Sequence, residues 1–196
     1  GGRVNVLYHQ NRYNLAMLAC AGGAVDVLQY LLQHGQGVEL PPMAPTGLGQ
    51  LAARSGSVAC LELLASAGID MLAVDEDGAS PLHYAAGFHR IDAMGWLLAR
   101  GADVNQSDAS GATPLHRLLA HANVMDRQHA DYLPRATAAL WLLLDAGADL
   151  NASDGTRPNL PTRIHRLFGD AVANQLLVFD PQAPRRLGAK NFSPKP

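Results

Sequence analysis

The sequence has few residues of several types, and each shortage excludes a class of protein. Cys20 and Cys60 are its two cysteines, too few for a disulfide framework. No apolar run approaches the roughly 18 residues of a membrane-spanning helix. The run from Ala138 to Leu144 has seven residues. Aromatic residues form 6% of the 196 residues, and the apolar content is mostly Ala and Leu, which predicts a globular protein of packed helices.

Motifs of common catalytic sites are also missing from the sequence. It contains no G-x-S-x-G, no glycine-rich phosphate loop and no H-E-x-x-H. His121 and His129 form a mixed group with Asp126 and Asp131, but their separations match no zinc-site spacing. The sequence therefore predicts a non-catalytic chain with no cofactor, no metal site and no small-molecule substrate.

Charge is unevenly distributed along the chain. Residues 1–155 hold 8 Arg and 15 acidic residues, a net charge of −7, whereas residues 156–196 hold 7 basic and 2 acidic residues, a net charge of +5. A basic tail can indicate nucleic-acid binding. No nucleic-acid motif or interleaving of aromatic and basic residues accompanies it, so a solvated tail is the favoured interpretation.

A repeat is what the sequence does contain. Gly35 returns as Gly68 and Gly101 at intervals of 33 residues. The same interval separates other matching residues: Ala19, Ala52 and Ala85; Gly78 and Gly111; Pro81 and Pro114; His83 and His116. A fixed period between 20 and 50 residues is typical of a solenoid of stacked units, whose binding surface extends along the row.

Two units share the same sequence motifs. Residues 78–86 read G-A-S-P-L-H-Y-A-A and that unit closes at 96–105 with W-L-L-A-R-G-A-D-V-N. Residues 111–118 read G-A-T-P-L-H-R-L and are followed at 142–151 by L-L-L-D-A-G-A-D-L-N. These motifs resemble the ankyrin repeat, G-x-T-P-L-H-x-A-A followed by L-L-x-x-G-A-D-V-N. With two more divergent earlier units, the resemblance covers about residues 4–155.

The residue types at unit boundaries favour helices. Ser80 and Thr113 are good N-caps, followed by Pro81 and Pro114 at the first helical position. Glycines at 68, 101 and 147 suit the left-handed position after a helix. The fold class expected is an all-α ankyrin-repeat solenoid of helix-turn-helix units with projecting β-hairpin or loop fingers.

The resemblance also implies roles for conserved-type positions. The imidazoles of His83 and His116 are expected to bridge the cap hydroxyl and neighbouring backbone. Cys20 and Cys60 fall in small core positions shared with Ala86, Val27 and similar residues, so both thiols are expected to be buried and reduced. A reducing, cytoplasmic-type environment follows.

The domain organisation expected is one ankyrin domain, 1–180, and an extended or disordered tail, 181–196. Its repeats cover about 4–35, 36–68, 69–101 and 102–147, with a degenerate cap at 148–180. Repeat four holds 13 extra residues, an insertion near 121–133, after which Pro134 is expected to restart the second helix. Prolines in 40–46 predict an irregular first finger.

The family resemblance implies protein–protein recognition along the finger tips and the exposed face of the inner helices. The partner-binding residues expected on that surface are Tyr13, Arg54, Glu76, Asp77, Phe88, Ser110 and His121. For Phe88, packing against Tyr84 one turn back is an equal alternative. The role of the insertion, neutral or functional, stays open.

Three contexts fit such a module. The excess of 13 Arg over 2 Lys favours a high-GC, bacterial source, and Gly1-Gly2 in place of Met favours a piece of a longer protein. The chain could be the recognition domain of an effector secreted into a host cell, or the ankyrin part of a multidomain enzyme. It could instead be a stand-alone inhibitor or immunity-type binder. Asn105 and Asn151 also occupy the position that is hydroxylated in some eukaryotic ankyrin domains.

Overall fold

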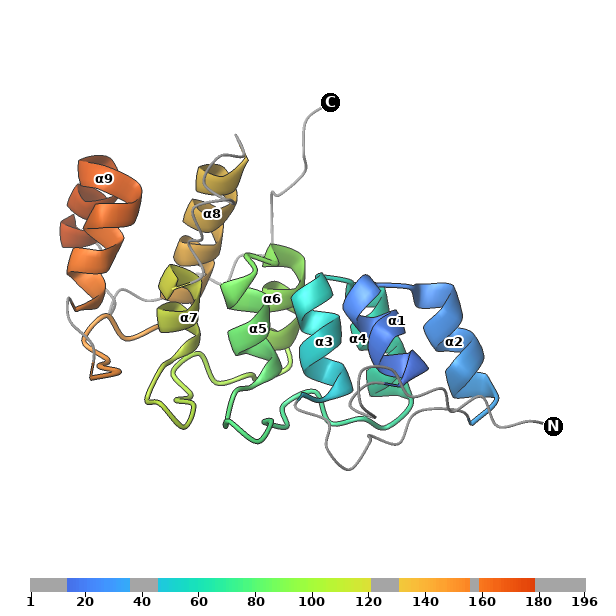
Figure 1. Cartoon of the computed structure of the whole chain (residues 1–196). Coiled ribbons are helices and arrows are strands. Elements are labelled where there is room, and N and C mark those ends of the chain that lie inside the picture. Colours follow the sequence, from blue (N-terminus) through green and yellow to red (C-terminus); the bar gives the residue numbers. More distant parts are fainter. Residues whose placement is uncertain (1–13, 36–45, 121–130, 156–158, 179–196) are drawn as a thin grey trace.

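The computed structural model describes residues 14–35, 46–120, 131–155 and 159–178. These residues form helices and turns, with no strand among them, so the all-α expectation is confirmed. The helices are α1 (Leu15–Gly22), α2 (Val25–Gln33), α3 (Leu48–Ser55), α4 (Val58–Ser66), α5 (Pro81–Gly87), α6 (Ile91–Leu98), α7 (Pro114–Ala120), α8 (Tyr132–Asp145) and α9 (Leu160–Val178) (Figure 1).

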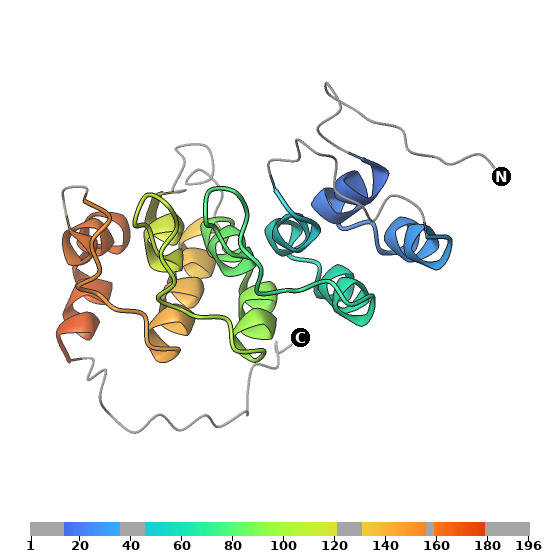
Figure 2. The same cartoon turned by 90° about the horizontal axis from the view of Figure 1, so that it is seen from below.

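The helices are arranged as a row of antiparallel pairs in two layers. The inner helices α1, α3, α5 and α7 pack on one another in sequence order, and α9 continues their row beside α7. The outer helices α2, α4, α6 and α8 form the second layer (Figures 1 and 2). Leu28, Leu61 and Met94, one from each of three outer helices, are fully buried in a core shared between neighbours. Each unit thus buries its apolar face against the next one.

Local chemistry explains where the helices begin and end. Ser80 has extended backbone angles before α5, Pro81 takes the first helical position, and a capping box joins Ser80 to His83. At the other end of a unit, Gly68 and Gly101 follow the outer helices with φ of 82° and 86°. This left-handed conformation is costly for a residue with a Cβ atom, and the glycines provide it as the sequence predicted.

The fingers before α5 and α7 are loops and not β-hairpins, the two forms that the sequence left open. In the finger before α5, the Asp75 N–H donates to the Ala79 carbonyl at 3.1 Å. In the finger before α7, the Asp108 N–H donates in the same way to the Ala112 carbonyl at 2.9 Å. Each pair closes a tight turn without a strand ladder. The two fingers also touch, since the Ala109 N–H donates to the carbonyl of Asp77 at 2.8 Å.

The second helix of repeat four differs from its prediction. Helix α8 begins at Tyr132, two residues before Pro134, and its 14 residues exceed the 8 or 9 of α2, α4 and α6. Proline is tolerated in the first turn because the N–H groups there have no intrahelical acceptor. Part of the insertion therefore lengthens a helix.

The cap contains helical residues on both sides of a break. Helix α9 is interrupted at Gly169, whose φ of 75° and ψ of −176° are not helical. Ile164, before the break, is fully buried, and Leu160 is 1% exposed. The repeat and cap boundaries given above remain predictions.

Both cysteines are buried and free, as expected, and burial raises the pKa of Cys20 to about 12. Val27 departs from the expected core position that it shares with Cys60, because its side chain is 43% exposed. Its helix, α2, is the first outer helix described, so no described helix precedes it on that side.

Several sequence predictions lie outside the described residues: Tyr13, His121, most of the insertion, the 40–45 connector and the tail at 181–196. In the part of the chain that the structure describes, no helix has both the length and the apolar character needed to cross a membrane.

Candidate partner-binding surface

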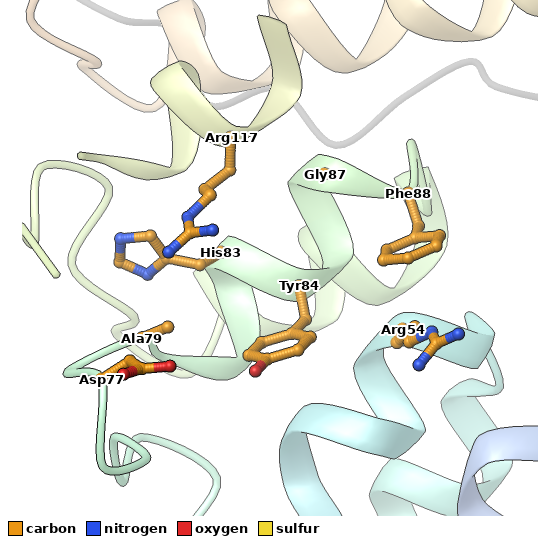
Figure 3. A pocket seen from close by; sticks show the side chains of 8 residues that line it. All are labelled: Arg54, Asp77, Ala79, His83, Tyr84, Gly87, Phe88 and Arg117. Carbon is orange, nitrogen blue, oxygen red and sulfur yellow. The ribbon is translucent and has the colours of Figure 1, made fainter. Parts of the chain in front are cut away.

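A pocket of about 300 Å³ opens on the inner layer, between α3, α5, α7 and the finger before α5 (Figure 3). Its walls bring together three of the residues that the sequence predicted for partner binding, Arg54, Asp77 and Phe88. Glu76 and Ser110 are exposed on the fingers and do not line it. The full lining is Arg54, Asp77, Ala79, His83, Tyr84, Gly87, Phe88 and Arg117.

Arg54 and Phe88 form one end of this pocket. Arg54 lies in the last turn of α3, and its guanidinium carbon stands 4.9 Å from the centre of the Phe88 ring at the end of α5. The backbone of Arg54 is held as well, since its carbonyl accepts a hydrogen bond from Arg90 Nε at 2.9 Å. A cation over an aromatic face is attracted by the ring's electrons. Phe88 thus supports a cation from the neighbouring repeat.

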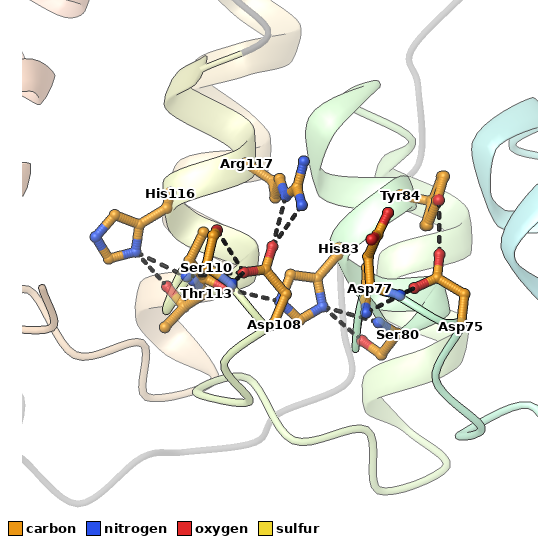
Figure 4. A network of polar contacts seen from close by, with 12 residues as sticks. Asp75, Asp77, Ser80, His83, Tyr84, Asp108, Ser110, Thr113, His116 and Arg117 are labelled. Carbon is orange, nitrogen blue, oxygen red and sulfur yellow. Dashed lines mark hydrogen bonds and ion pairs between the residues drawn. The ribbon is translucent and has the colours of Figure 1, made fainter. Parts of the chain in front are cut away.

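Tyr84 forms the middle of the pocket and is fixed by the finger. Its hydroxyl donates to Asp75 Oδ2 at 2.7 Å, while Asp75 Oδ1 accepts from the backbone N–H groups of Asp77 at 3.1 Å and Ala79 at 2.9 Å (Figure 4). Burial, together with the bond to Asp75, raises the pKa of the Tyr84 phenol. The phenol is therefore a neutral donor that ties α5 to the finger turn.

Arg117 fills the corresponding position in the next repeat. Its Nε donates to Asp108 Oδ2 at 2.9 Å, and Asp108 Oδ1 accepts from the Ser110 N–H, the Ser110 hydroxyl and the Ala112 N–H at 2.8, 2.6 and 3.0 Å (Figure 4). Burial alone would raise the pKa of Asp108, but the hydrogen bonds from Ser110, Arg117 and Ala112 outweigh it and lower the pKa to about 2. The charge of Arg117 is thus compensated inside the protein.

The two repeat histidines have the bridging role that the family resemblance implied. His83 Nδ1 accepts from the Ser80 N–H at 3.1 Å, so the ring proton lies on Nε2, which donates to the Ala112 carbonyl at 3.0 Å. His116 Nδ1 accepts likewise from the Thr113 N–H at 3.2 Å. Burial lowers the pKa of both imidazoles. They are neutral structural groups at neutral pH.

Sequence reasoning missed the carboxylates that organise these fingers. Asp75 and Asp108 are 33 residues apart, and so are their partners Tyr84 and Arg117. The period could have identified the aspartates, but the differing chemistry of the partners concealed the pairing. Gln50 was also missed. It takes the position of His83 one repeat earlier, and its amide nitrogen donates to the carbonyls of Ala73 and Ala79 at 3.0 and 3.4 Å.

Asn105 is engaged in a link between repeats. Its Nδ2 donates to the Gly147 carbonyl and its Oδ1 accepts from the Asp149 N–H, both at 2.8 Å. Of the two side chains that the hydroxylation hypothesis names, Asn105 therefore uses both ends of its amide in structural bonds, and Asn151 is exposed.

The described residues hold no group of three or more His, Cys, Asp or Glu side chains placed to bind one metal ion. Of the mixed group near the insertion, Asp131 is described, and His121, Asp126 and His129 are not. The polar side chains of the pocket are mostly occupied in holding fingers to helices. Chemically, the arrangement provides a shaped surface with an aromatic centre and an exposed cation.

Comparison with known families agrees with the fold. The family model for ankyrin repeats (3 copies) matches residues 50–154, just over half of the chain. The chain belongs to the ankyrin repeat family, whose repeats generally mediate protein–protein interaction. No curated protein matches it.

Proposed function

We propose that this chain is a non-catalytic recognition module that binds a protein partner along its inner face and finger tips. The observation that carries the proposal is the pocket in which Arg54, Asp77 and Phe88 meet. These residues come from two inner helices and a finger, so a partner placed there contacts adjacent repeats at once. An extended surface of this kind is how solenoids bind their partners.

Phe88 and Arg54 belong to the residue types that dominate binding energy at interfaces. Aromatic rings and arginines are enriched at interfaces and their hot spots, where large side chains fill well-packed, desolvated pockets. Phe88 is half-buried in the free chain, and Arg54 is exposed above it. Glu76 and Ser110, with Tyr13 and His121, would extend the contact toward the finger tips and neighbouring repeats.

The context that we propose is the recognition domain of a larger bacterial protein of the effector type. The arginine-rich, lysine-poor composition supports a bacterial source. An ankyrin domain of a multidomain enzyme, or a stand-alone inhibitor, would use the same surface.

The test uses partners captured by the immobilised chain from extracts of the source organism and of its host cells, where an effector would act, and identified by mass spectrometry. Phe88→Ala should weaken binding of the true partner by at least ~2 kcal/mol, about thirtyfold. The matched control is Arg100→Ala, because Arg100 also covers an aromatic ring, Trp96, at 3.5 Å, but lies at the end of the outer helix α6. Lost binding in the control with full binding in Phe88→Ala would contradict the proposal.

A further inference from the structure

Arg54 differs from Arg117, the other arginine of the pocket, in having no acidic partner among the described residues. Arg117 is paired with Asp108, and Arg163, in the cap, is paired with Asp154 at 3.2 Å. Among the described residues, no carboxylate lies within ion-pair distance of the Arg54 guanidinium. The pocket therefore contains one cation, Arg54, and one carboxylate, Asp77, that form no ion pair with any described residue.

The position of Arg54 also prepares it for one kind of ligand. The Arg54 guanidinium carbon lies over the Phe88 ring, 4.9 Å from its centre, and no described residue accepts a hydrogen bond from the guanidinium N–H groups. Those donors match the two oxygens of a carboxylate in a bidentate pair. The supporting ring limits the conformations of the side chain, so less entropy is lost when the pair forms.

The remainder of the pocket indicates what surrounds that carboxylate. Tyr84 lies between Arg54 and the finger residue Asp77, and its hydroxyl is turned to Asp75 (Figure 3). The ring faces of Tyr84 and Phe88, with Gly87 and Ala79, make the centre of the pocket largely apolar. A side chain bound beside Arg54 therefore meets apolar surface next.

We propose that the partner presents a short linear segment in which an Asp or Glu side chain pairs with Arg54 and an adjacent apolar side chain covers Tyr84 and Phe88. The inference rests on the proposed function and specifies the chemistry of the segment that is bound. Its basis is charge complementarity at an ordered cation, at a place where a second cation is already neutralised.

Arg100 on Trp96 shows why position matters as well as pairing. The cation and ring are closer there, at 3.5 Å, but they lie in the outer layer and outside the pocket. A carboxylate at Arg100 would have no adjoining part of this cavity to fill. The two arginines therefore form a matched pair of site and control.

The experiment selects peptides from a displayed library of random twelve-residue sequences on the immobilised full chain. Parallel selections use Arg54→Glu, Phe88→Ala and Arg100→Glu, each checked first for an unchanged circular dichroism spectrum and melting temperature. Peptides selected on the unmodified chain should be enriched in Asp or Glu beside an apolar residue. They should bind Arg54→Glu about tenfold more weakly or worse, since charge-assisted hydrogen bonds are lost.

The possible results distinguish a failure of the acidic-segment inference from a failure of the proposed protein-binding function. Enrichment of acidic peptides on the unmodified chain and on Arg100→Glu, with basic peptides selected on Arg54→Glu, supports the inference. Peptides that need Phe88 but show no acidic preference overturn the inference and leave the proposed function standing. Peptides that bind Phe88→Ala and Arg54→Glu as well as the unmodified chain overturn both. A selection that enriches no sequence overturns the inference, because a short linear segment is then not what the pocket binds.

Discussion

The fingers of repeats three and four have the same pattern of hydrogen bonds around an aspartate, but the aspartate bonds to a different type of helix residue in each. In both, an aspartate oxygen closes the turn by accepting two backbone N–H groups, and the other oxygen accepts from the residue nine positions later. That residue is Tyr84 in repeat three and Arg117 in repeat four. The geometry is shared, but the chemistry changes from a phenol to a guanidinium.

This difference shows that the position of a residue in the repeat and its chemical type contribute separately to how each finger is held. The 33-residue period sets where a side chain meets its finger, and the side chain sets how strongly the finger is held. Asp108 is 6% exposed and bonded to a cation, whereas Asp75 is half-buried and bonded to a neutral hydroxyl. In repeat two the sequence has Pro42 and Leu51 at these positions, which cannot form such a bond. The finger of repeat four should therefore be held more strongly than that of repeat three.

The largest effect is expected from removing the two aspartates in turn. Asp108→Ala leaves Arg117 and three finger donors without their acceptor, and should lower the free energy of unfolding by about 3 kcal/mol or more. Asp75→Ala leaves the Tyr84 hydroxyl and the backbone N–H groups of Asp77 and Ala79 without their acceptor. These donors are all neutral and Asp75 is half-buried, so the loss should be about 1–2 kcal/mol. Urea unfolding followed by circular dichroism measures both. Equal losses of unfolding free energy in the two variants would contradict the expectation that the finger of repeat four is held more strongly than that of repeat three.

A second prediction uses acid instead of truncation. The pKa of Asp108 is about 2 in the folded protein against an ordinary value of 3.8, so the unfolded chain takes up its proton first as the pH falls. The stabilisation is complete above the ordinary pKa and is lost as the pH falls toward 2. By linkage it amounts to about 2 kcal/mol.

Its measurement compares the unmodified chain with Asp108→Asn, which cannot titrate at this position. Between pH 5 and 2 the free energy of unfolding should fall further in the unmodified chain than in the variant, by about 2 kcal/mol. Because every other carboxylate is common to both proteins, their contributions cancel in the difference. Parallel curves would show that the Asp108–Arg117 pair does not hold the finger of repeat four electrostatically.

The repeat made much of this fold predictable. A serine or threonine before proline, and a glycine after a leucine pair, specify local backbone geometry wherever they occur. Hence α5 and α7 begin at Pro81 and Pro114 as expected. Arg54, Asp77 and Phe88 could be grouped because positions that share a face of one unit also share it along the row.

What the sequence left unpredicted depends on contacts between residues of unlike type. The amino-acid sequence does not indicate that Asp75 pairs with a tyrosine and Asp108 with an arginine. The hydrogen bond needs only a donor at the correct distance, whatever its residue type. The start of α8 before Pro134 and the exposure of Val27 depend on what lies beside them, which periodicity does not report. The contact of the Arg54 guanidinium with the Phe88 ring joins two repeats, and the spacing of residues within one repeat does not predict it.

The smallest expected effect on stability concerns the inner-helix residue whose side chain bonds to the finger of the following repeat. Gln50 donates to the Ala79 carbonyl as His83 does to that of Ala112, so two repeats meet one geometric need with an amide and an imidazole. The imidazole can titrate and the amide cannot. Burial lowers the pKa of His83 below 6.5, so the unfolded chain binds its proton more readily, and stability is lost as the pH falls below that value.

Replacing His83 with glutamine should therefore reproduce in repeat three the amide-to-carbonyl hydrogen bond that Gln50 makes in repeat two. At pH 8, His83→Gln should cost less than about 1 kcal/mol, because the bond to Ala112 can still form, whereas His83→Ala should cost about 1–3 kcal/mol. Between pH 7.5 and 5.5 the stability of His83→Gln should fall less than that of the unmodified chain, by up to about 1 kcal/mol. Urea unfolding at each pH measures both quantities. If His83→Gln is as unstable at pH 8 as His83→Ala, the amide and the imidazole are not equivalent, and repeat two holds the finger of repeat three by another means.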